Sequence, residues 1–139
     1  MTNEDKELLL KDICTRLPYF LKVNIKGSVE VLNSWADDDG NYFNFLSDGP
    51  ECNFGEGFTL DDIKPYLRPM SSMTEEEEIE YHNLCYEDEI EVFEFGEWVT
   101  KTRFHNTIDS IDYLNAHYFD YRGLIPMGLA LEAPKEMYN

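Results

Sequence analysis

The stretch that decides the fold is residues 20–35, which read FLKVNIKGSVEVLNSW. An apolar side chain stands at every second position from Leu21 to Ile25, with polar side chains between them. Such alternation is typical of a strand with one buried face. Gly27-Ser28 is a tight-turn signal, and alternation resumes with Val29 and Val31. We therefore predict a β-hairpin in which Val29 and Val31 share one face of the second strand.

A helix is expected before this hairpin and a third strand after it. Apolar residues repeat at helical spacing over 3–17, on a face formed by Leu9, Leu10, Ile13, Cys14 and Leu17. Thr2 or Asn3 can cap the helix, and Pro18 stops it. A polar turn over 37–41 leads to a strand from Tyr42 to Leu46. The hairpin and this strand predict a three-stranded antiparallel meander.

The second half of the chain mixes helical and extended patterns. We expect a loop over 47–58, followed by a helical turn around 63–67. A helix start lies within 71–77, with Ser or Thr as its cap, and this helix would run to about Leu84. Strands over 88–104 with a bulge or turn at Gly96, and a helix from 106 to Gly123, would follow. The buried stripe of that last helix would be Ile108, Ile111, Leu114 and Tyr118. The apolar tail as far as Ala133 is expected to pack on the core.

These elements predict an α+β fold: a single domain over residues 1–139, with an antiparallel sheet of four to six strands and three or four helices. The composition agrees with a folded chain. Of its 139 residues, 42% are hydrophobic and 14% aromatic, enough to build a core, whereas disordered acidic segments are poor in aromatic residues.

Charge is the most informative feature for function. The formal net charge is -18, with nine carboxylates and no basic residue between Lys26 and Lys64, and eleven carboxylates and no basic residue between Arg68 and Lys101. Such a chain repels nucleic acid and anionic membranes and attracts basic surfaces. The expected partner is therefore a basic protein, without direct binding to nucleic acid or to a membrane.

The second acidic block has two interpretations: a solvated face that keeps the protein in solution, or a mimic of nucleic acid. Alternate residues of a strand stand about 6.6 Å apart on one face, close to the phosphate spacing along one DNA strand. Glu87, Glu89 and Glu91 could form such a row, extended by a glutamate-rich helix. The candidate partner-binding residues are Glu75, Glu76, Glu78, Glu80, Glu87, Glu89, Glu91 and Glu94.

No catalytic or metal-binding pattern stands out. The three histidines lack ligand spacing, so no metal and no cofactor is expected. His117 and Asp120 could be read as an acid/base pair, but no nucleophile or ligand set accompanies them. A histidine near a helix C-terminus is explained more simply by the helix dipole.

The cellular setting follows from the cysteines and the N-terminus. Cys14, Cys52 and Cys85 are odd in number and widely spaced, which favours reduced, mostly buried thiols over a disulfide framework. The N-terminus is acidic, unlike a signal peptide, and no apolar run is long enough to span a bilayer. We expect a soluble, cytoplasmic protein.

Four segments carry a resemblance to a known family: LLLKDICTRLPY at 8–19, IKPYLRPMSSMTEEEE at 63–78, LNAHYFDYRGLI at 114–125 and GLALEAP at 128–134. Together, these segments resemble small uncharacterised proteins of gut Bacteroides and their prophages and mobile elements. The resemblance implies no activity and no catalytic residue. It implies a cytoplasmic bacterial or phage setting and favours host-directed interaction over metabolism.

These observations favour a non-enzymatic acidic interaction protein that binds a basic, nucleic-acid-binding host protein as a mimic or inhibitor. A toxin-neutralising immunity protein would have the same acidic signature. A small enzyme whose site is assembled from residues distant in sequence is the alternative from another class.

Overall fold

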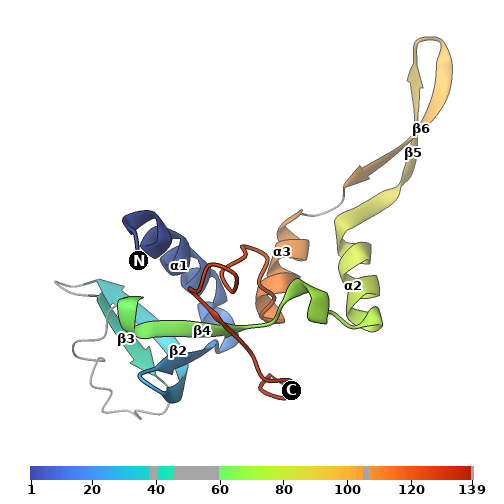
Figure 1. Cartoon of the computed structure of the whole chain (residues 1–139). Helices are drawn as coiled ribbons and strands as arrows, with labels where there is room; N and C mark the ends of the chain where they lie inside the picture. Colours follow the sequence, from blue (N-terminus) through green and yellow to red (C-terminus); the bar gives the residue numbers. More distant parts are fainter. Residues whose placement is uncertain (38–40, 46–59, 105–106, 139) are drawn as a thin grey trace. The chain divides into compact units, whose positions relative to one another are not determined.

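The structure is a computed structural model that describes the backbone of residues 1–37, 41–45, 60–104 and 107–138, and the side chains of these residues outside 33–37, 41–45, 86–90, 102–104 and 107. In chain order (Figure 1), the elements are α1 (Asn3–Arg16), η1 (Leu17–Tyr19), β1 (Lys22–Ile25), β2 (Ser28–Asp37), β3 (Asn41–Phe45), η3 (Leu60–Asp62), β4 (Ile63–Leu67), η4 (Met70–Ser72), α2 (Glu75–Cys85), β5 (Tyr86–Glu94), β6 (Glu97–Phe104), α3 (Thr107–Ala116) and β7 (Leu131–Glu132). The predicted α+β class is confirmed.

The described residues form two compact units. Unit 1 consists of Met1–Met70 and Asn115–Asn139, and unit 2 of Ser71–Leu114. Folding of the whole chain as a single domain stays a prediction. The turn expected at 37–41 falls largely outside the described residues, and the loop expected at 47–58 falls entirely outside them.

Unit 1 is built on a sheet whose described strands follow the order β3-β2-β1-β4-β7. The predicted meander is confirmed: β1 pairs antiparallel with β2, and β2 with β3. On its other side β1 pairs antiparallel with β4. The sheet also has a strand that the sequence did not predict, because β7 joins β4 in parallel at Tyr66 and Leu67.

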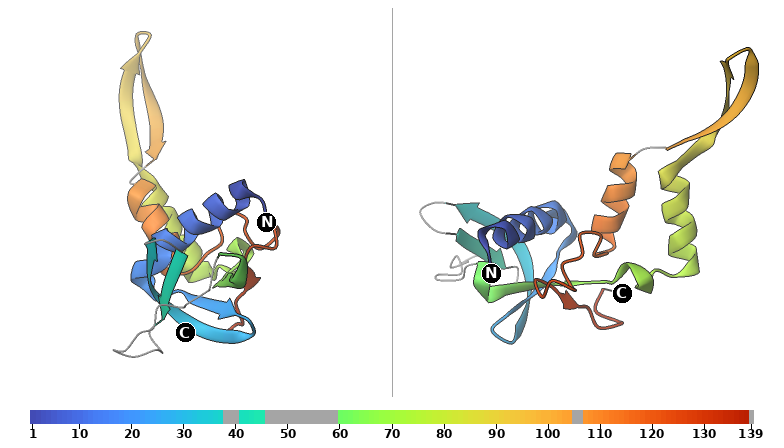
Figure 2. Two further views of the ribbon diagram at one scale, coloured as in Figure 1. Left: turned by 90° about the vertical axis from the view of Figure 1, so that its left-hand side faces the viewer. Right: turned by 45° about the horizontal axis from the view of Figure 1, so that its top comes forward.

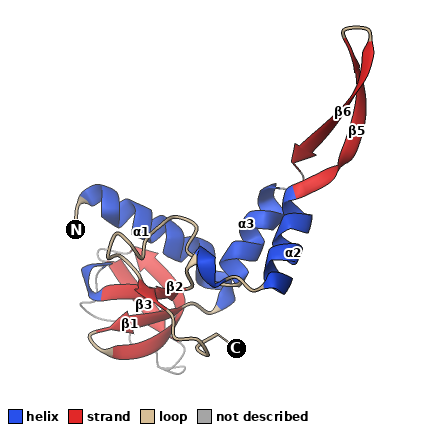
Figure 3. Ribbon diagram, turned by 45° about the vertical axis from the view of Figure 1, so that its right-hand side comes forward, coloured by secondary structure: helices blue, strands red, loops and turns tan. Residues whose placement is uncertain are grey.

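Helix α1 covers one face of this sheet (Figure 3). It begins with a capping box, in which the Thr2 hydroxyl accepts from the Asp5 N–H and the Asp5 carboxylate accepts from the Thr2 N–H. This arrangement satisfies N–H groups that a helix start leaves without partners. Leu9 and Ile13 are fully buried as predicted, and Pro18 follows in the 3-10 turn η1.

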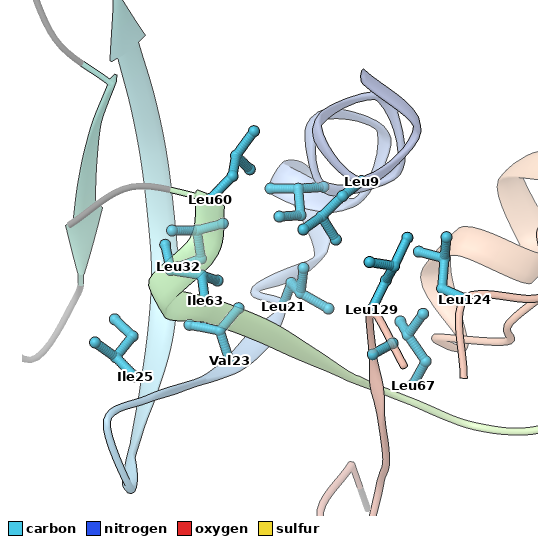
Figure 4. Packing of buried hydrophobic residues seen from close by; sticks show 12 residues of the cluster. Leu9, Leu21, Val23, Ile25, Leu32, Leu60, Ile63, Leu67, Leu124 and Leu129 are labelled. Atoms are coloured by element: carbon cyan, nitrogen blue, oxygen red, sulfur yellow. The ribbon is translucent and has the colours of Figure 1, made fainter. Parts of the chain in front are cut away.

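The core of unit 1 joins segments from both ends of the chain. Figure 4 shows Leu9 of α1 facing Leu21 and the strand residues, with Leu124 and Leu129 of the tail alongside. These four leucines are all buried. The prediction that the apolar tail packs on the core is therefore confirmed. A side chain of this size contributes about 1.5–3 kcal/mol when it is removed from water.

Two sequence predictions about the sheet of unit 1 are wrong. Residues 63–67 form strand β4, not a helical turn, because Ile63, Pro65 and Leu67 are buried and alternate with the residues between them. The phase of β2 is also reversed. Leu32 is buried and Val29 is exposed, since pairing with β1 through the Lys26–Gly27 turn turns the predicted apolar face outward.

Tyr138 ties the tail to the sheet. Its hydroxyl donates to the Tyr66 carbonyl at 2.8 Å and accepts from the Lys22 N–H at 3.0 Å. Its ring stacks on that of Tyr118, with centroids 3.6 Å apart. Burial raises the pKa of the Tyr138 hydroxyl well above its usual value, because the anion would lose its water.

Unit 2 contains two helical segments and a hairpin. In Figure 2, α2 leads directly into β5, and the β5–β6 hairpin returns to α3, which lies beside α2. The Tyr81 and Tyr113 rings join the two helices at 6.3 Å, and the Tyr113 hydroxyl donates to Glu80 Oε2 at 2.9 Å. The last predicted helix ends at Ala116, well before Gly123. Its predicted stripe is wrong at Ile108, which is exposed, and right at Leu114, which is buried.

Candidate functional site

Helix α2 presents half of the predicted partner-binding carboxylates. Its start is a capping box between Thr74 and Glu77, which satisfies the first N–H groups of the helix. Acidic residues in the first turn also suit the positive end of the helix dipole. The predicted residues Glu75, Glu76, Glu78 and Glu80 are all exposed. The structure thus places these four on one short helix.

Strand β5 holds the other predicted carboxylates. Glu91 is exposed, whereas Glu94 is half-buried and pairs with Lys101 of β6 at 2.5 Å. The side chains of Glu87 and Glu89 lie outside the described residues. The register shifts between Tyr86 and Glu89, so the bulge interrupts the regular alternation on which a row through Glu87 depended.

The hairpin turn is Phe95-Gly96, at the place where the sequence predicted a bulge or turn. Both residues have positive φ, 52° and 79°. Two-residue turns with φ > 0 at both positions match the twist of the flanking strands, and Asn-Gly is the pair that forms them best. Glycine accepts this backbone freely, but a bulky aromatic residue at positive φ is an outlier.

Aromatic side chains surround this turn. Phe93 and Trp98 are directly opposite each other in the β5–β6 pairing, with their rings edge to face at 5.3 Å. Phe93 is 59% exposed, Trp98 70% and Phe95 102%. We call these three residues the aromatic tip, because they form or flank the turn between β5 and β6. Figure 3 shows the hairpin that ends in this turn.

Exposed carboxylates flank the aromatic tip. Glu91 stands two positions before Phe93 in β5, and Glu97 stands next to Trp98 at the start of β6; both are exposed. Glu94 and Glu97 are directly opposite each other across the strands. Like charges in that position destabilise a strand pair, and the Lys101 ion pair offsets part of this repulsion.

Unit 2 buries little of its own apolar surface. Of its described side chains, only Ser110 and Leu114 are buried. Ile79, Val99 and Ile108 are exposed in addition to the aromatic tip. An exposed large side chain is common when it stands alone, whereas a gathered apolar patch marks an interaction site.

Unit 1 contains a buried ionic cluster that the sequence analysis did not find. The Arg16 guanidinium donates to both oxygens of Asp12, from Nε at 2.9 Å and from Nη2 at 3.1 Å, and from Nη2 to the Phe119 carbonyl at 2.6 Å. Both ionised side chains are 0% exposed. Arg122 adds a second donor to Asp12 at 3.2 Å. The cluster therefore fastens α1 to the segment after α3.

Tyr121 completes this cluster. The Arg16 and Arg122 guanidinium carbons lie 5.2 Å and 4.8 Å from the centre of its ring, distances at which a cation is attracted to an aromatic face. Its hydroxyl accepts from Arg122 at 3.1 Å and donates to Asn115 Oδ1 at 2.9 Å. Arg16 Nη1 is buried without a hydrogen-bond partner among the residues that the structure describes. Because Nε and Nη2 of Arg16 and both oxygens of Asp12 bond within the protein, we interpret the cluster as structural.

His117 and Asp120 do not form an acid/base pair in this geometry. Both Asp120 carboxylate oxygens accept from backbone N–H groups, of Leu124 at 2.8 Å and of Ile125 at 2.9 Å. The His117 ring instead stacks on Phe119, with centroids 6.4 Å apart. Asp120 therefore shapes the turn that follows it.

The prediction of buried thiols is wrong for Cys14, which is exposed, although desolvation still raises the pKa of its thiol. Cys85 is half-buried, and Cys52 lies outside the described residues. Within the described ranges, no group of three or more His, Cys, Asp or Glu side chains is arranged to hold a metal ion. Over the same ranges, every helix is too short or too polar to cross a membrane.

No family model, curated protein or solved structure matches this chain.

Sequence reasoning found the carboxylates but missed the aromatic tip. The signal was present in residues 93–98, FEFGEW, where three aromatic residues surround a glycine turn between charged residues. The alternation of a hairpin with one buried face would place its large apolar residues on that face alone. Aromatic residues at the turn itself do not fit this pattern, and they were the sequence feature that indicated a binding role for the hairpin.

Proposed function

We propose that this chain is a non-enzymatic interaction protein that binds a basic, nucleic-acid-binding protein through unit 2. The observation that carries the proposal is that Ser71–Leu114 combines exposed carboxylates with exposed large apolar side chains. A solvated face made only for solubility would lack the apolar component. Interaction surfaces instead place apolar residues at the centre and charge at the rim.

Charge decides which class of partner fits. The formal net charge is -18, so nucleic acid and anionic lipid surfaces are repelled, and a basic protein is attracted over long range. Charged rims mainly speed association and fix specificity, and their effect weakens as salt rises. The resemblance to proteins of Bacteroides prophages and mobile elements adds a cytoplasmic host setting to this proposal.

The test compares two variants with equal charge changes. The first, Glu76→Gln, Glu78→Gln and Glu91→Gln, neutralises exposed carboxylates of unit 2. The control, Glu7→Gln, Glu132→Gln and Glu136→Gln, neutralises exposed carboxylates of unit 1. Both are used to capture proteins from a Bacteroides lysate, and each captured partner is purified and titrated between low and moderate salt.

The expected result is a basic partner whose affinity for the parent falls steeply as salt rises. The unit 2 variant should bind this partner at least roughly tenfold more weakly, because several rim charges act together. The unit 1 control variant should lose clearly less affinity for the same partner. Equal losses in the two variants would mean that only the total charge matters. Failure of the parent to capture any basic protein would leave the acidic block as a solvated face.

A further inference from the structure

From the hairpin geometry we infer that the aromatic tip is the anchor of this surface: Phe93, Phe95 and Trp98 insert into an apolar pocket that is surrounded by basic residues on the partner protein. The inference rests on the proposed function and adds to it the part of unit 2 that provides specificity. Carboxylates alone would attract many basic surfaces. A rigid aromatic group that must fit a pocket selects among them.

The first observation is that the aromatic side chains of the tip are exposed to solvent. An isolated two-stranded hairpin is marginally stable in water, because it has no face on which to bury apolar groups. This hairpin nevertheless carries Phe95 fully exposed and Trp98 70% exposed. Aromatic side chains of this kind bury 150–250 Å² each when they are covered, so binding would remove a large apolar area from water.

The second observation is the backbone of the turn. Phe95 adopts φ 52°, where a residue with a Cβ is disfavoured by roughly 1–2 kcal/mol relative to the right-handed region. Asparagine would form this turn more readily. The tip therefore carries its aromatic residue at a local cost in stability, and strained residues of this kind cluster at binding sites.

The third observation is the negative charge around the tip, which determines the class of partner protein that the tip can bind. Glu91 and Glu97 are exposed beside it, so a second copy of the chain would bring the same carboxylates together. Like-charge contacts of that kind suppress a wrong partner. A protein with a basic rim around its pocket complements both the tip and its surroundings.

The experiment uses two synthetic peptides of equal length and charge, labelled with fluorescein: one alternates Lys and Leu, the other Lys and Ser. Fluorescence anisotropy measures the binding of each to the full chain. Three chains are compared: the parent, Phe95→Asn, and Phe20→Asn as a matched control. Phe20 is also an exposed phenylalanine at positive φ, 58°, but it lies in unit 1.

The parent is expected to bind the Lys–Leu peptide at least roughly tenfold more tightly than the Lys–Ser peptide. The serine peptide lacks the apolar side chains that the aromatic tip would contact, and the loss of an anchor contact typically has an effect of this size. Phe95→Asn should remove most of that difference and leave Lys–Ser binding unchanged, because the turn is kept or strengthened. Phe20→Asn should preserve the difference. Trp98→Thr, which retains a strand-forming residue, should act as Phe95→Asn does.

The outcomes separate the two proposals. If neither peptide binds the parent, the proposed function fails. If both peptides bind equally and Phe95→Asn changes neither, the acidic surface stands and the anchor is overturned. Tight binding of the tip to vesicles of phosphatidylcholine, or concentration-dependent self-association that Phe95→Asn abolishes, would also overturn it by assigning the tip to a membrane or to a second copy.

Discussion

Replacing Asp12 by asparagine is the sharpest test of how unit 1 is held together. The substitution keeps the shape of the side chain but removes the only charge that faces two guanidinium groups in the described cluster. Arg16 is 0% exposed and cannot turn to water, whereas Arg122 is 19% exposed and can do so in part. The main cost is therefore one buried and uncompensated cation.

Breaking a buried ion pair from one side costs about 3–5 kcal/mol, a large part of the 5–15 kcal/mol that stabilises a typical domain. Glu94→Gln is the matched control, because it breaks the pair with Lys101, in which both side chains remain accessible to water. Pairs of that kind contribute about 0–1 kcal/mol. Urea unfolding followed by far-UV circular dichroism gives both values, with the slope m used to check that the transition is comparable.

A third variant separates the charge from the contacts. Asp12→Leu with Arg16→Met removes the buried pair together, and such replacements are often neutral or stabilising. The double variant should lose less free energy of unfolding than Asp12→Asn alone. A loss below about 1 kcal/mol for Asp12→Asn, or an equal loss for Glu94→Gln, would refute the reasoning.

Three further predictions concern pH, salt and metal. Burial raises the folded-state pKa of Tyr138, so its contribution to the free energy of unfolding should be fully present below the unfolded pKa of about 10 and should be lost as pH rises above it. Urea midpoints measured between pH 8 and 11 check this, and a flat profile would contradict it. Added salt at pH 7 should raise the melting temperature, since screening weakens repulsion in a chain of net charge -18; an unchanged or lower temperature would show that repulsion does not limit stability. Protein purified without chelator should contain no stoichiometric zinc or iron by elemental analysis, because no histidine or cysteine set has ligand spacing.

Local patterns in the sequence were enough for the elements that are stabilised locally. The capping box of α2 uses Thr74, one of the serine and threonine caps predicted within 71–77. The hairpin alternation from Leu21 to Ile25 placed the right side chains in the core. Turn chemistry located the β5–β6 connection at Gly96. In each case the determining residues lie within one turn or one strand pair.

Contacts between distant segments were beyond the same reasoning. Arg16 and Phe119 are 103 positions apart, so nothing near Arg16 marks it as a buried residue. A charged pair at helical spacing is normally a solvated surface feature. The strand character of 63–67 likewise depends on β1 on one side and on β7, which comes from the tail, on the other.

The candidate site was predicted in part. Four of its glutamates were expected on a helix, and the structure places them there. The aromatic tip was not expected, because Phe93, Phe95 and Trp98 read from sequence as ordinary strand residues. Their position around the Gly96 turn was the signal in the sequence, and their exposure in the structure distinguishes them from core residues.

The division of unit 1 into Met1–Met70 and Asn115–Asn139 has a consequence for synthesis. During translation β4 forms before its parallel neighbour β7 exists, and Leu124 and Leu129, which complete the core, emerge late. The nascent chain therefore carries a half-built core and an open strand edge while unit 2 is made. Unpaired edges of this kind can pair with another chain.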